Sequence, residues 1–346
     1  MTKLKDIADH LNISVSTVSR VVNNKDRVDP KTREKILTAL KEFNYYPNEF
    51  ARSLKKNSSN VIGIIVPDIT NIFFSTIIKA IDLYTRQKNY SIIFCNSDGD
   101  TAREKECLEI LLHRKIAALI IATVNGYSIN IQQYFKLKIP VVFIDNIPNI
   151  NENFNSVTID NYNASITIVK YLLENGHRRI YTLTGPLNET TAAERLEGWK
   201  AALAQAGVLY DEDWISVCNF KEESGYKATK AILSKSVIPT AIFAANNFMA
   251  YGAIKAILEN GLRVPEDISV ATFDAIDNTG LMQFKLTSII QPANEIGKLA
   301  AEICIQNYQE NEIRAFNKII LENELIIGNT TKDCLNETGA ANNHEI

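Results

Sequence analysis

The sequence lacks the features that mark membrane-spanning, secreted and zinc-binding chains. No apolar run approaches the roughly 18 residues that a membrane helix needs, and charged residues stand within the first five positions, where a secretory signal would be forming. The five cysteines, at 95, 107, 218, 304 and 334, are odd in number and widely separated, and the four histidines are equally scattered. We therefore expect a cytoplasmic protein with reduced cysteines, no metal and no membrane partner.

The glycines also lack the spacings that bind phosphates. None of the 14 glycines forms a GxG pair or the five-residue spacing of a P-loop, and no GxSxG elbow occurs. We therefore expect no nucleotide cofactor and no enzymatic activity. A sugar-processing α/β enzyme stays open as a remote alternative, because a fold does not fix a function.

Charge is distributed unevenly along the 346 residues. Residues 1–60 hold 12 Lys and Arg against 7 Asp and Glu, a net of +5, whereas residues 61–346 hold 25 against 33, a net of −8. A basic head on an acidic body is typical of a discrete nucleic-acid-binding module, since only the head should approach phosphate.

The stretch from Leu4 to Asn23 predicts two short helices joined by a tight turn. Apolar residues recur at helical spacing on both sides of Asn12 and Ser14. Asn12 tolerates the left-handed conformation that such a turn needs, and Ser14 can accept a backbone N–H at the start of the second helix. The pattern is typical of a helix-turn-helix. The polar face of its second helix suits a DNA major groove and carries Ser16, Thr17, Ser19, Arg20 and Asn23.

A third helix and a short linker follow. Asp29 and Pro30 supply a cap and a first helical residue, and Ile36, Leu40 and Phe43 supply an apolar stripe. Pro47 can open another short helix that ends near Leu54, before a Lys- and Ser-rich linker.

From residue 60 onward, short β-branched runs alternate with amphipathic helical segments. This alternation predicts parallel sheets covered by helices on both faces. The strands are too many for one compact sheet, so we expect two doubly wound domains that divide near Asp160, with one or two final strands in 317–331.

Polar residues end most of these strands, at the edge where open α/β sheets bind ligands. We interpret Asp98 and Asp160 as turn or capping residues. For Asp145, Asn246, Asp274 and Gln291 we expect a role in ligand binding.

Three segments resemble the LacI/GalR family of bacterial transcription regulators: DIADHLNISVSTVSRVVN, KTREKILTALKEFNYYPN and FARSL. The resemblance implies an all-α helix-turn-helix head and an α/β body of two doubly wound parallel-sheet subdomains of periplasmic-binding-protein type. It places the DNA-binding domain in 1–46, a hinge helix and linker in 47–59, the effector-binding and dimerisation domain in 60–331 and a polar tail in 332–346. Within the body, the N-subdomain would comprise about 60–160 plus 291–320, and the C-subdomain about 161–290 plus 321–331.

The resemblance also implies DNA contacts. The head of the second helix would read bases, and Leu54 would wedge into the minor groove at the centre of the operator. The tail lacks the leucine heptads of tetrameric relatives, so we expect a homodimer on a near-palindromic operator of double-stranded DNA. The expected DNA-binding residues are Ser14, Val15, Ser16, Thr17, Ser19, Arg20, Asn23, Ala51 and Leu54.

For the body, the resemblance implies a sugar pocket. Sugar hydroxyls both donate and accept hydrogen bonds, and aromatic rings cover the apolar faces of the sugar. The expected ligand-binding residues are Asn71, Phe73, Phe74, Asp145, Arg195, Phe220, Asn246, Asp274 and Gln291. Asn146 departs from the pattern, since many ribose-type members carry Arg there. Asn247 replaces the usual Asp, and we expect it to cap the following helix.

These observations predict a repressor of a carbohydrate-utilisation operon that a small sugar or sugar derivative releases from its operator. A corepressor-dependent regulator of the same family, acting with a small molecule or a corepressor protein, is the alternative. A transport-type sugar-binding protein is disfavoured by the missing signal segment.

Overall fold

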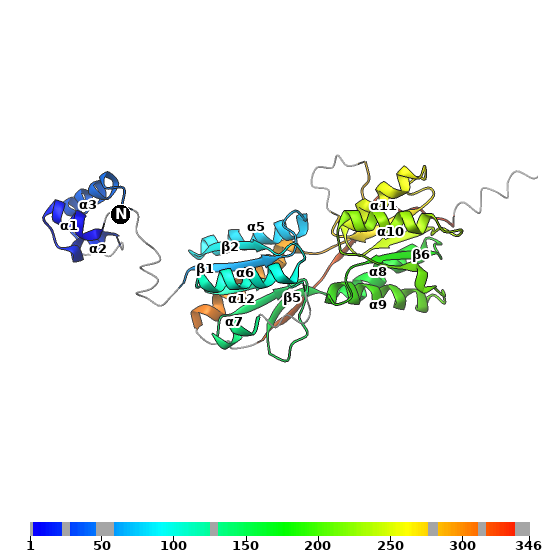
Figure 1. The fold of residues 1–346 in the computed structure, drawn as a ribbon, viewed down its shortest axis with the longest axis horizontal. Helices are drawn as coiled ribbons and strands as arrows, with labels where there is room; N and C mark the ends of the chain where they lie inside the picture. Colours follow the sequence, from blue (N-terminus) through cyan, green and yellow to red (C-terminus); the bar gives the residue numbers. More distant parts are fainter. Residues whose placement is uncertain are drawn as a thin grey trace, which may run out of the picture. The chain divides into compact units, whose positions relative to one another are not determined.

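The computed structural model describes residues 3–22, 28–45, 59–124, 131–275, 283–310 and 316–335. The chain divides into two compact units, Met1–Ser59 and Asn60–Ile346, which we call the head and the body (Figure 1). Among the described residues, no helix combines the length and the apolar character needed to cross a bilayer.

Within its described residues, 3–22, 28–45 and 59, the head contains three short helices, α1 (Leu4–Leu11), α2 (Val15–Val22) and α3 (Pro30–Glu42). Their apolar stripes meet in one small core, which consists of Ile7, Ala8, Val18, Val21, Ile36 and Ala39. The predicted helix-turn-helix and its third helix are therefore present.

Local hydrogen bonds explain where the helices of the head begin and end. Asn12 adopts a left-handed conformation with φ of 54° at the end of α1, and the Ser14 hydroxyl accepts a hydrogen bond from the Thr17 backbone N–H at 3.2 Å. Asp29 caps α3 by accepting from the Thr32 N–H at 3.1 Å. The three predicted turn and capping roles are confirmed.

The described part of the body contains two six-stranded sheets. The first has the strand order β11-β5-β4-β3-β1-β2, and its strand pairs are parallel. Its strands are β1 (Val61–Val66), β2 (Ser91–Asn96), β3 (Ala118–Ile121), β4 (Val141–Ile144), β5 (Asn155–Ile159) and β11 (Lys318–Leu321). One face is covered by α5 (Ile72–Gln87) and α12 (Ala293–Glu310), and the other by α6 (Thr101–His113) and α7 (Gln132–Lys136). We call this half the N-subdomain.

The second sheet has the order β12-β10-β9-β8-β6-β7, with β12 antiparallel to β10. Its strands are β6 (Ile180–Thr184), β7 (Ile215–Val217), β8 (Ala241–Ala244), β9 (Ser269–Phe273), β10 (Thr287–Ile290) and β12 (Glu324–Ile326). Helices α8 (Asn161–Glu174) and α9 (Thr190–Gln205) cover one face, and α10 (Glu222–Leu233) and α11 (Asn247–Glu259) cover the other. A short helix, η2 (Glu212–Trp214), precedes β7. We call this half the C-subdomain.

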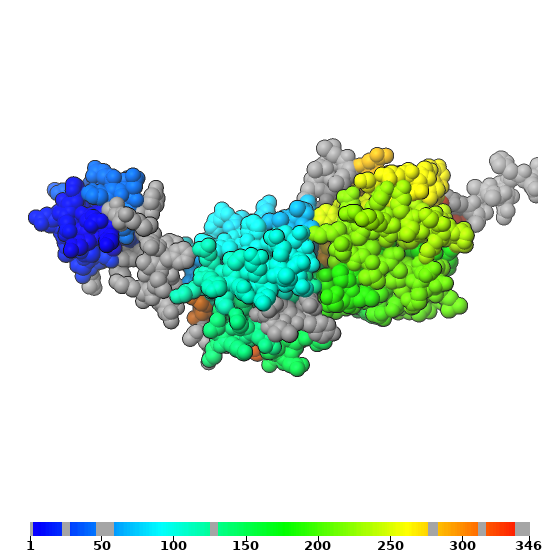
Figure 2. Space-filling view, in the orientation of Figure 1, coloured from blue at the N-terminus to red at the C-terminus, as the bar shows by residue number. Residues whose placement is uncertain are grey.

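The expected fold class is confirmed: a helical head and two doubly wound α/β subdomains. The chain passes between the two sheets after β5, after β10 and after β11. The space-filling view shows the two halves of the body as separate lobes that meet along a boundary (Figure 2). The carboxyl ends of the parallel strands in both sheets face this boundary (Figure 1).

The N-cap of α11 is Asn246, one position before the residue expected, because its Oδ1 accepts a hydrogen bond from the Met249 N–H at 3.0 Å. Asn247 is the first residue of the helix, and its Oδ1 also accepts a hydrogen bond in the first turn, from the Phe248 N–H at 2.9 Å. Asn247 is buried, and the same Oδ1 accepts a hydrogen bond from the Asn71 amide of the N-subdomain at 3.2 Å. Asp160 caps α8 as expected, by accepting from the Asn163 N–H at 2.9 Å.

Candidate functional site

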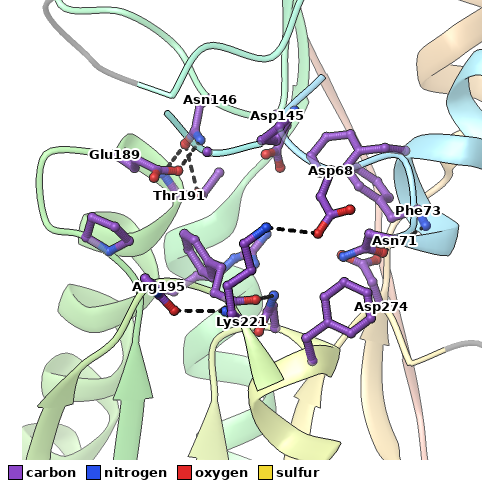
Figure 3. A pocket seen from close by; sticks show the side chains of 18 residues that line it. Asp68, Asn71, Phe73, Asp145, Asn146, Glu189, Thr191, Arg195, Lys221 and Asp274 are labelled. Atoms are coloured by element: carbon purple, nitrogen blue, oxygen red, sulfur yellow. Dashed lines mark hydrogen bonds and ion pairs between the residues drawn. The ribbon is translucent and has the colours of Figure 1, made fainter. Parts of the chain in front are cut away.

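The largest concentration of polar strand ends surrounds a cavity between the two subdomains (Figure 3). Its volume, including the opening to solvent, is about 750 Å³, which falls within the usual range of small-molecule sites. Residues of both subdomains line it: Pro67, Asp68, Asn71, Phe73, Phe74, Gly99, Asp145, Asn146, Pro186, Glu189, Thr191, Arg195, Asn219, Phe220, Lys221, Asn246, Phe248 and Asp274.

Every residue predicted to bind ligand lines this cavity except Gln291. Gln291 is buried behind it, and its amide donates to the Asp274 carboxylate at 2.6 Å. Its backbone N–H donates to the other oxygen of the same carboxylate at 3.1 Å. Gln291 therefore orients Asp274 and does not itself line the cavity.

Aromatic rings form the apolar part of the cavity wall. Phe73 and Phe74, at the start of α5, are both buried and pack edge to face. Phe220 has a positive φ of 61°, which turns its ring against Gly185. A Cβ on Gly185 would lie 2.2 Å from the Phe220 ring, so this glycine makes room for the aromatic wall.

Arg195 is buried and fixed by the C-subdomain. Its Nε donates to Asn161 Oδ1 at 2.9 Å, and Nη1 donates to the Ala245 carbonyl at 2.6 Å. The guanidinium lies 3.9 Å from the centre of the Phe273 ring. These contacts hold the guanidinium rigidly in the cavity wall. Its positive charge can still interact with carboxylates or with a ligand.

Two carboxyl groups face Arg195 from opposite subdomains. Burial raises the pKa of Asp145 to about 6, and the nearby Asp274 and Glu194 add to the increase, while Arg195 opposes it. Burial also raises the pKa of Asp274, against the effects of Arg195 and Gln291. Asp145 accepts no hydrogen bond from any other described residue, so its oxygens are available as acceptors to a molecule in the cavity.

Two contacts that connect the subdomains across the cavity were not predicted from the sequence. In the first, Asn146 donates to Glu189 Oε2 at 2.6 Å and accepts from the hydroxyl of Thr191 at 2.8 Å. In the second, Lys221 Nζ lies 3.3 Å from Asp68 Oδ2 and 3.0 Å from Asp98 Oδ1. Figure 3 shows Asn146, Glu189 and Thr191 together on one side and Lys221 beside Asp68. The departure at Asn146 was visible in the sequence, but its partners lie more than 40 positions away.

Burial also perturbs Glu189. The buried position raises the pKa of Glu189 to about 8, against the hydrogen bond from Asn146, and the negative charges of Asp145 and Glu104 raise it further. At neutral pH Glu189 is therefore a protonated acid, which can donate as well as accept a hydrogen bond.

In the head, the residues expected to contact DNA lie at the start and along one side of α2. Ser14, Val15, Ser16 and Arg20 are exposed, whereas Val18 is fully buried. Thr17 and Ser19 are partly exposed. The Ser14 hydroxyl lies 2.8 Å from both the Ser16 and Thr17 hydroxyls, so these groups form one connected polar surface. Asn23, Ala51 and Leu54 lie outside the described residues.

Among the described residues, no group of three or more His, Cys, Asp or Glu side chains is arranged to hold a metal ion. A helix-turn-helix head joined to a two-lobed α/β body with a cavity between the lobes defines a class of protein: a DNA-binding regulator with a small-molecule effector.

Comparison with known proteins agrees with this class. Residues 3–48 match the bacterial regulatory proteins of the lacI family, and residues 59–321 match the periplasmic binding proteins and sugar binding domain of the LacI family. The chain belongs to the LacI family. Its members are DNA-binding transcriptional repressors and not enzymes, so the expectations of a repressor and of no enzymatic activity are confirmed.

Individual relatives cover nearly the whole chain. The HTH-type transcriptional repressor PurR of Haemophilus influenzae (strain PittEE) is 32% identical over 97% of this chain and 100% of its own length. The ribose operon repressor of Escherichia coli (strain K12) is 33% identical over 88% of this chain and 92% of its own. The crystal structure of the lac repressor dimer bound to operator and the anti-inducer ONPF has a TM-score of 0.83 at 28% identity and covers 96% of this chain and 99% of that one.

Proposed function

We propose that this repressor controls carbohydrate-utilisation genes and is released from its operator by a small sugar or sugar derivative. The observation that carries the proposal is the cavity, where carboxylates, amides and a guanidinium surround a space walled by Phe73, Phe74 and Phe220. This combination matches a sugar, whose hydroxyls need both donors and acceptors and whose ring faces are weakly apolar. A LacI family regulator from Enterococcus faecium, solved with bound ribose, matches the body with a TM-score of 0.69 at 28% identity, covering 79% of this chain and 99% of that one.

The position of the cavity supports a mechanism of release. A ligand that contacts both subdomains favours one relative angle of the two, and only a difference in affinity between two states shifts their populations. In our proposal that change reaches the operator through a hinge in 47–59. There Leu54, which lies outside the described residues, wedges into the minor groove.

On the DNA side, we propose a homodimer on a near-palindromic operator, with two-fold symmetry shared by protein and DNA. Val15 and Ser16 would contact base edges, while Thr17, Ser19 and Arg20 would divide between phosphate and base contacts. The exposure of Val15, 43% on a helix that buries Val18 completely, supports this assignment. Such a regulator would act on the bacterial nucleoid.

Operator selection is the first test. Random duplexes are selected with the purified full chain, and the complex with the enriched duplex is titrated with a panel of pentoses, hexoses and their phosphates. We expect a palindrome, and we expect one sugar to release it. If a panel member strengthened binding to the palindrome, the effect of the ligand on operator binding would be the opposite of the one proposed, and the ligand would be a corepressor. If no duplex is enriched, or no panel member alters binding, the proposal fails.

A single substitution then connects the response to the cavity. We expect Asp145→Asn to bind the operator as the unsubstituted chain does, but to need at least tenfold more sugar for release. Because Asp145 accepts no hydrogen bond from the described chain, this isosteric change removes a ligand contact without breaking a hydrogen bond among the described residues. Glu197→Gln is the control, since Glu197 is exposed on α9 and pairs with Lys200. Equal responses in the two variants would remove Asp145 from the site.

A further inference from the structure

One edge of the N-subdomain collects basic side chains. The connections that lead from a helix into β2, β3 and β4 are residues 88–90, 114–117 and 137–140. Together they hold four Lys or Arg and no Asp or Glu. The strands of this sheet pair in parallel and in register, so these connections lie side by side. They occupy the edge of the sheet that faces away from the boundary between the lobes (Figure 1).

These side chains, with the last residue of α7, form a surface that we call the basic edge. It consists of Lys88, Arg114, Lys115, Lys136 and Lys138. All five residues are exposed, and none forms an ion pair with another described residue. Their charges are therefore available to a partner.

The basic edge is opposite in sign to the body that carries it. Two carboxylates lie beside it: Glu152 precedes β5, and Glu310 ends α12. The end of α12 reaches this edge, because the ring of Tyr308 packs on that of Tyr90 with centres 6.4 Å apart. Residues 61–346 as a whole carry a net charge of −8. A concentration of unpaired cations on an acidic body favours an anionic partner at this edge.

Cations at helix ends also stabilise the negative end of the helix dipole, and the C-subdomain shows how far this effect reaches. Its own helix-to-strand connections hold four Lys or Arg and five Asp or Glu, a net charge of −1 against +4 in the N-subdomain. Two of these cations are paired, Lys235 with Asp213 at 3.4 Å and Arg263 with Asp267 at 3.1 Å. Helix ends alone therefore do not explain the basic edge. The connections compared are 175–179, 206–214, 234–240 and 260–268.

The linker from the head joins the body within the basic edge. Strand β1 begins at Val61, and the carbonyl of Asn60 accepts a hydrogen bond from the Ser91 N–H at 2.9 Å. In the sheet β1 lies between β2 and β3, so the chain enters the body between the connections that carry Lys88 and Lys115. The linker thus tethers a DNA-binding head to this edge, which favours DNA over an acidic protein as the partner.

We propose that the basic edge is a second DNA-binding surface, which contacts backbone phosphates of the duplex that the head binds. Lys and Arg side chains that contact phosphates contribute affinity and salt dependence but carry no sequence information directly. The basic edge therefore strengthens operator binding without changing the preferred bases. This role does not depend on the identity of the effector.

The test measures the affinity of the full chain for the duplex enriched by operator selection, over a range of salt concentrations. Lys115→Gln combined with Lys138→Gln removes two charges from the basic edge of each chain. Each phosphate contact contributes about 1 to the slope of log K against log salt. We therefore expect the slope to become shallower by about 2 or more, and the affinity at about 0.1 M salt to fall at least tenfold.

The control removes the same charge elsewhere on the body. Lys170→Gln combined with Lys227→Gln neutralises two exposed lysines of α8 and α10, which pair with Glu174 and Glu223. We expect the control to bind the duplex with nearly the slope and the affinity of the unsubstituted chain. Equal affinities and slopes in the two double variants would overturn the proposal.

Ethylation of single phosphates in the same duplex distinguishes direct contact from a general effect of charge. An ethylated phosphate is neutral, so it weakens binding only where a cation contacts it. We expect phosphates at which ethylation weakens binding of the unsubstituted chain but not of the Lys115 and Lys138 double variant. Phosphates contacted by the head should interfere in both, which also shows that the variant is folded. Identical interference patterns would overturn the proposal and leave an acidic protein as the partner of the basic edge.

Discussion

Asn146 caps a helix of the opposite subdomain through Thr191. Its Oδ1 accepts a hydrogen bond from the Thr191 backbone N–H at 3.1 Å and from the Thr191 hydroxyl at 2.8 Å. The residue that precedes α9, Glu189, makes no capping hydrogen bond of its own. The first turn of α9 is therefore completed by a residue that follows β4 in the other half of the body, and any opening of the cavity at this point must break the cap.

The cap predicts an effect on closure. Asn146→Ala should remove about 1 kcal/mol from the closed arrangement, the usual value of an N-cap, and so weaken binding of an effector that needs closure about fivefold. Calorimetric titration measures this change. Asn153→Ala, at an exposed loop position of the same subdomain, is the control. An affinity in Asn146→Ala equal to that of the control would show that the cap does not contribute to closure.

The ion pairs of Lys221 should contribute less free energy to effector binding than the Asn146 cap does. Lys221 is 38% exposed in its side chain, and pairs of this kind are worth about 0.2–1 kcal/mol and are screened by salt. We expect Lys221→Met to change affinity for an uncharged effector less than about fivefold and to remove most of its dependence on ionic strength. Lys227→Met is the matched control, because Lys227 pairs with Glu223 on the same helix, away from the cavity. If effector affinity in Lys221→Met still depended on ionic strength, the salt dependence could not be assigned to the ion pairs of Lys221.

Glu189 predicts a pH dependence of stability. Its pKa is near 8 in the folded body and near 4.5 in an unfolded chain, so the folded state binds more protons between these values. The contribution of Glu189 is therefore fully present below about pH 4.5 and is lost as pH rises to about 8. Chemical denaturation at pH 5, 7 and 9 should show stability falling with pH, and Glu189→Gln should remove that component. The same slope in Glu189→Gln and in Glu197→Gln would assign the pH dependence to other groups.

Substitutions at two valines of α2 should affect different properties, one the stability of the head and the other its DNA binding. Val18 is fully buried and Val15 is 43% exposed. Val18→Ala should destabilise the head by about 2 kcal/mol through lost burial and a cavity. Val15→Ala should leave the melting temperature of the head nearly unchanged but alter the bases preferred in operator selection. A shift in melting temperature of similar size for both, with one unchanged operator, would remove Val15 from the DNA-contacting surface.

Local signals predicted much of this structure. Asn12, Ser14 and Asp29 act within a few residues of their own positions, so their turn and capping roles could be derived from neighbouring sequence alone. The α/β alternation and the polar strand ends predicted both sheets and brought Asp145, Asn246 and Asp274 to one cavity, because parallel strands align their carboxyl ends. Resemblance to the family supplied the expected roles of Arg195, Phe220 and Asn71, which no local pattern distinguishes from core or capping residues.

The sequence by itself determined the helical head, the two sheets and the edge at which the cavity lies, since each depends on periodicity and on neighbouring turn residues. Only the tertiary structure decided which polar groups pair across that cavity. Gln291 orients Asp274 instead of lining the cavity, and Asn146 caps α9 from the other subdomain. Lys221 is neutralised by carboxylates more than 100 positions away. Such pairings form where the two lobes of the body meet, and their energies depend on distance and burial, which no local run of residues encodes.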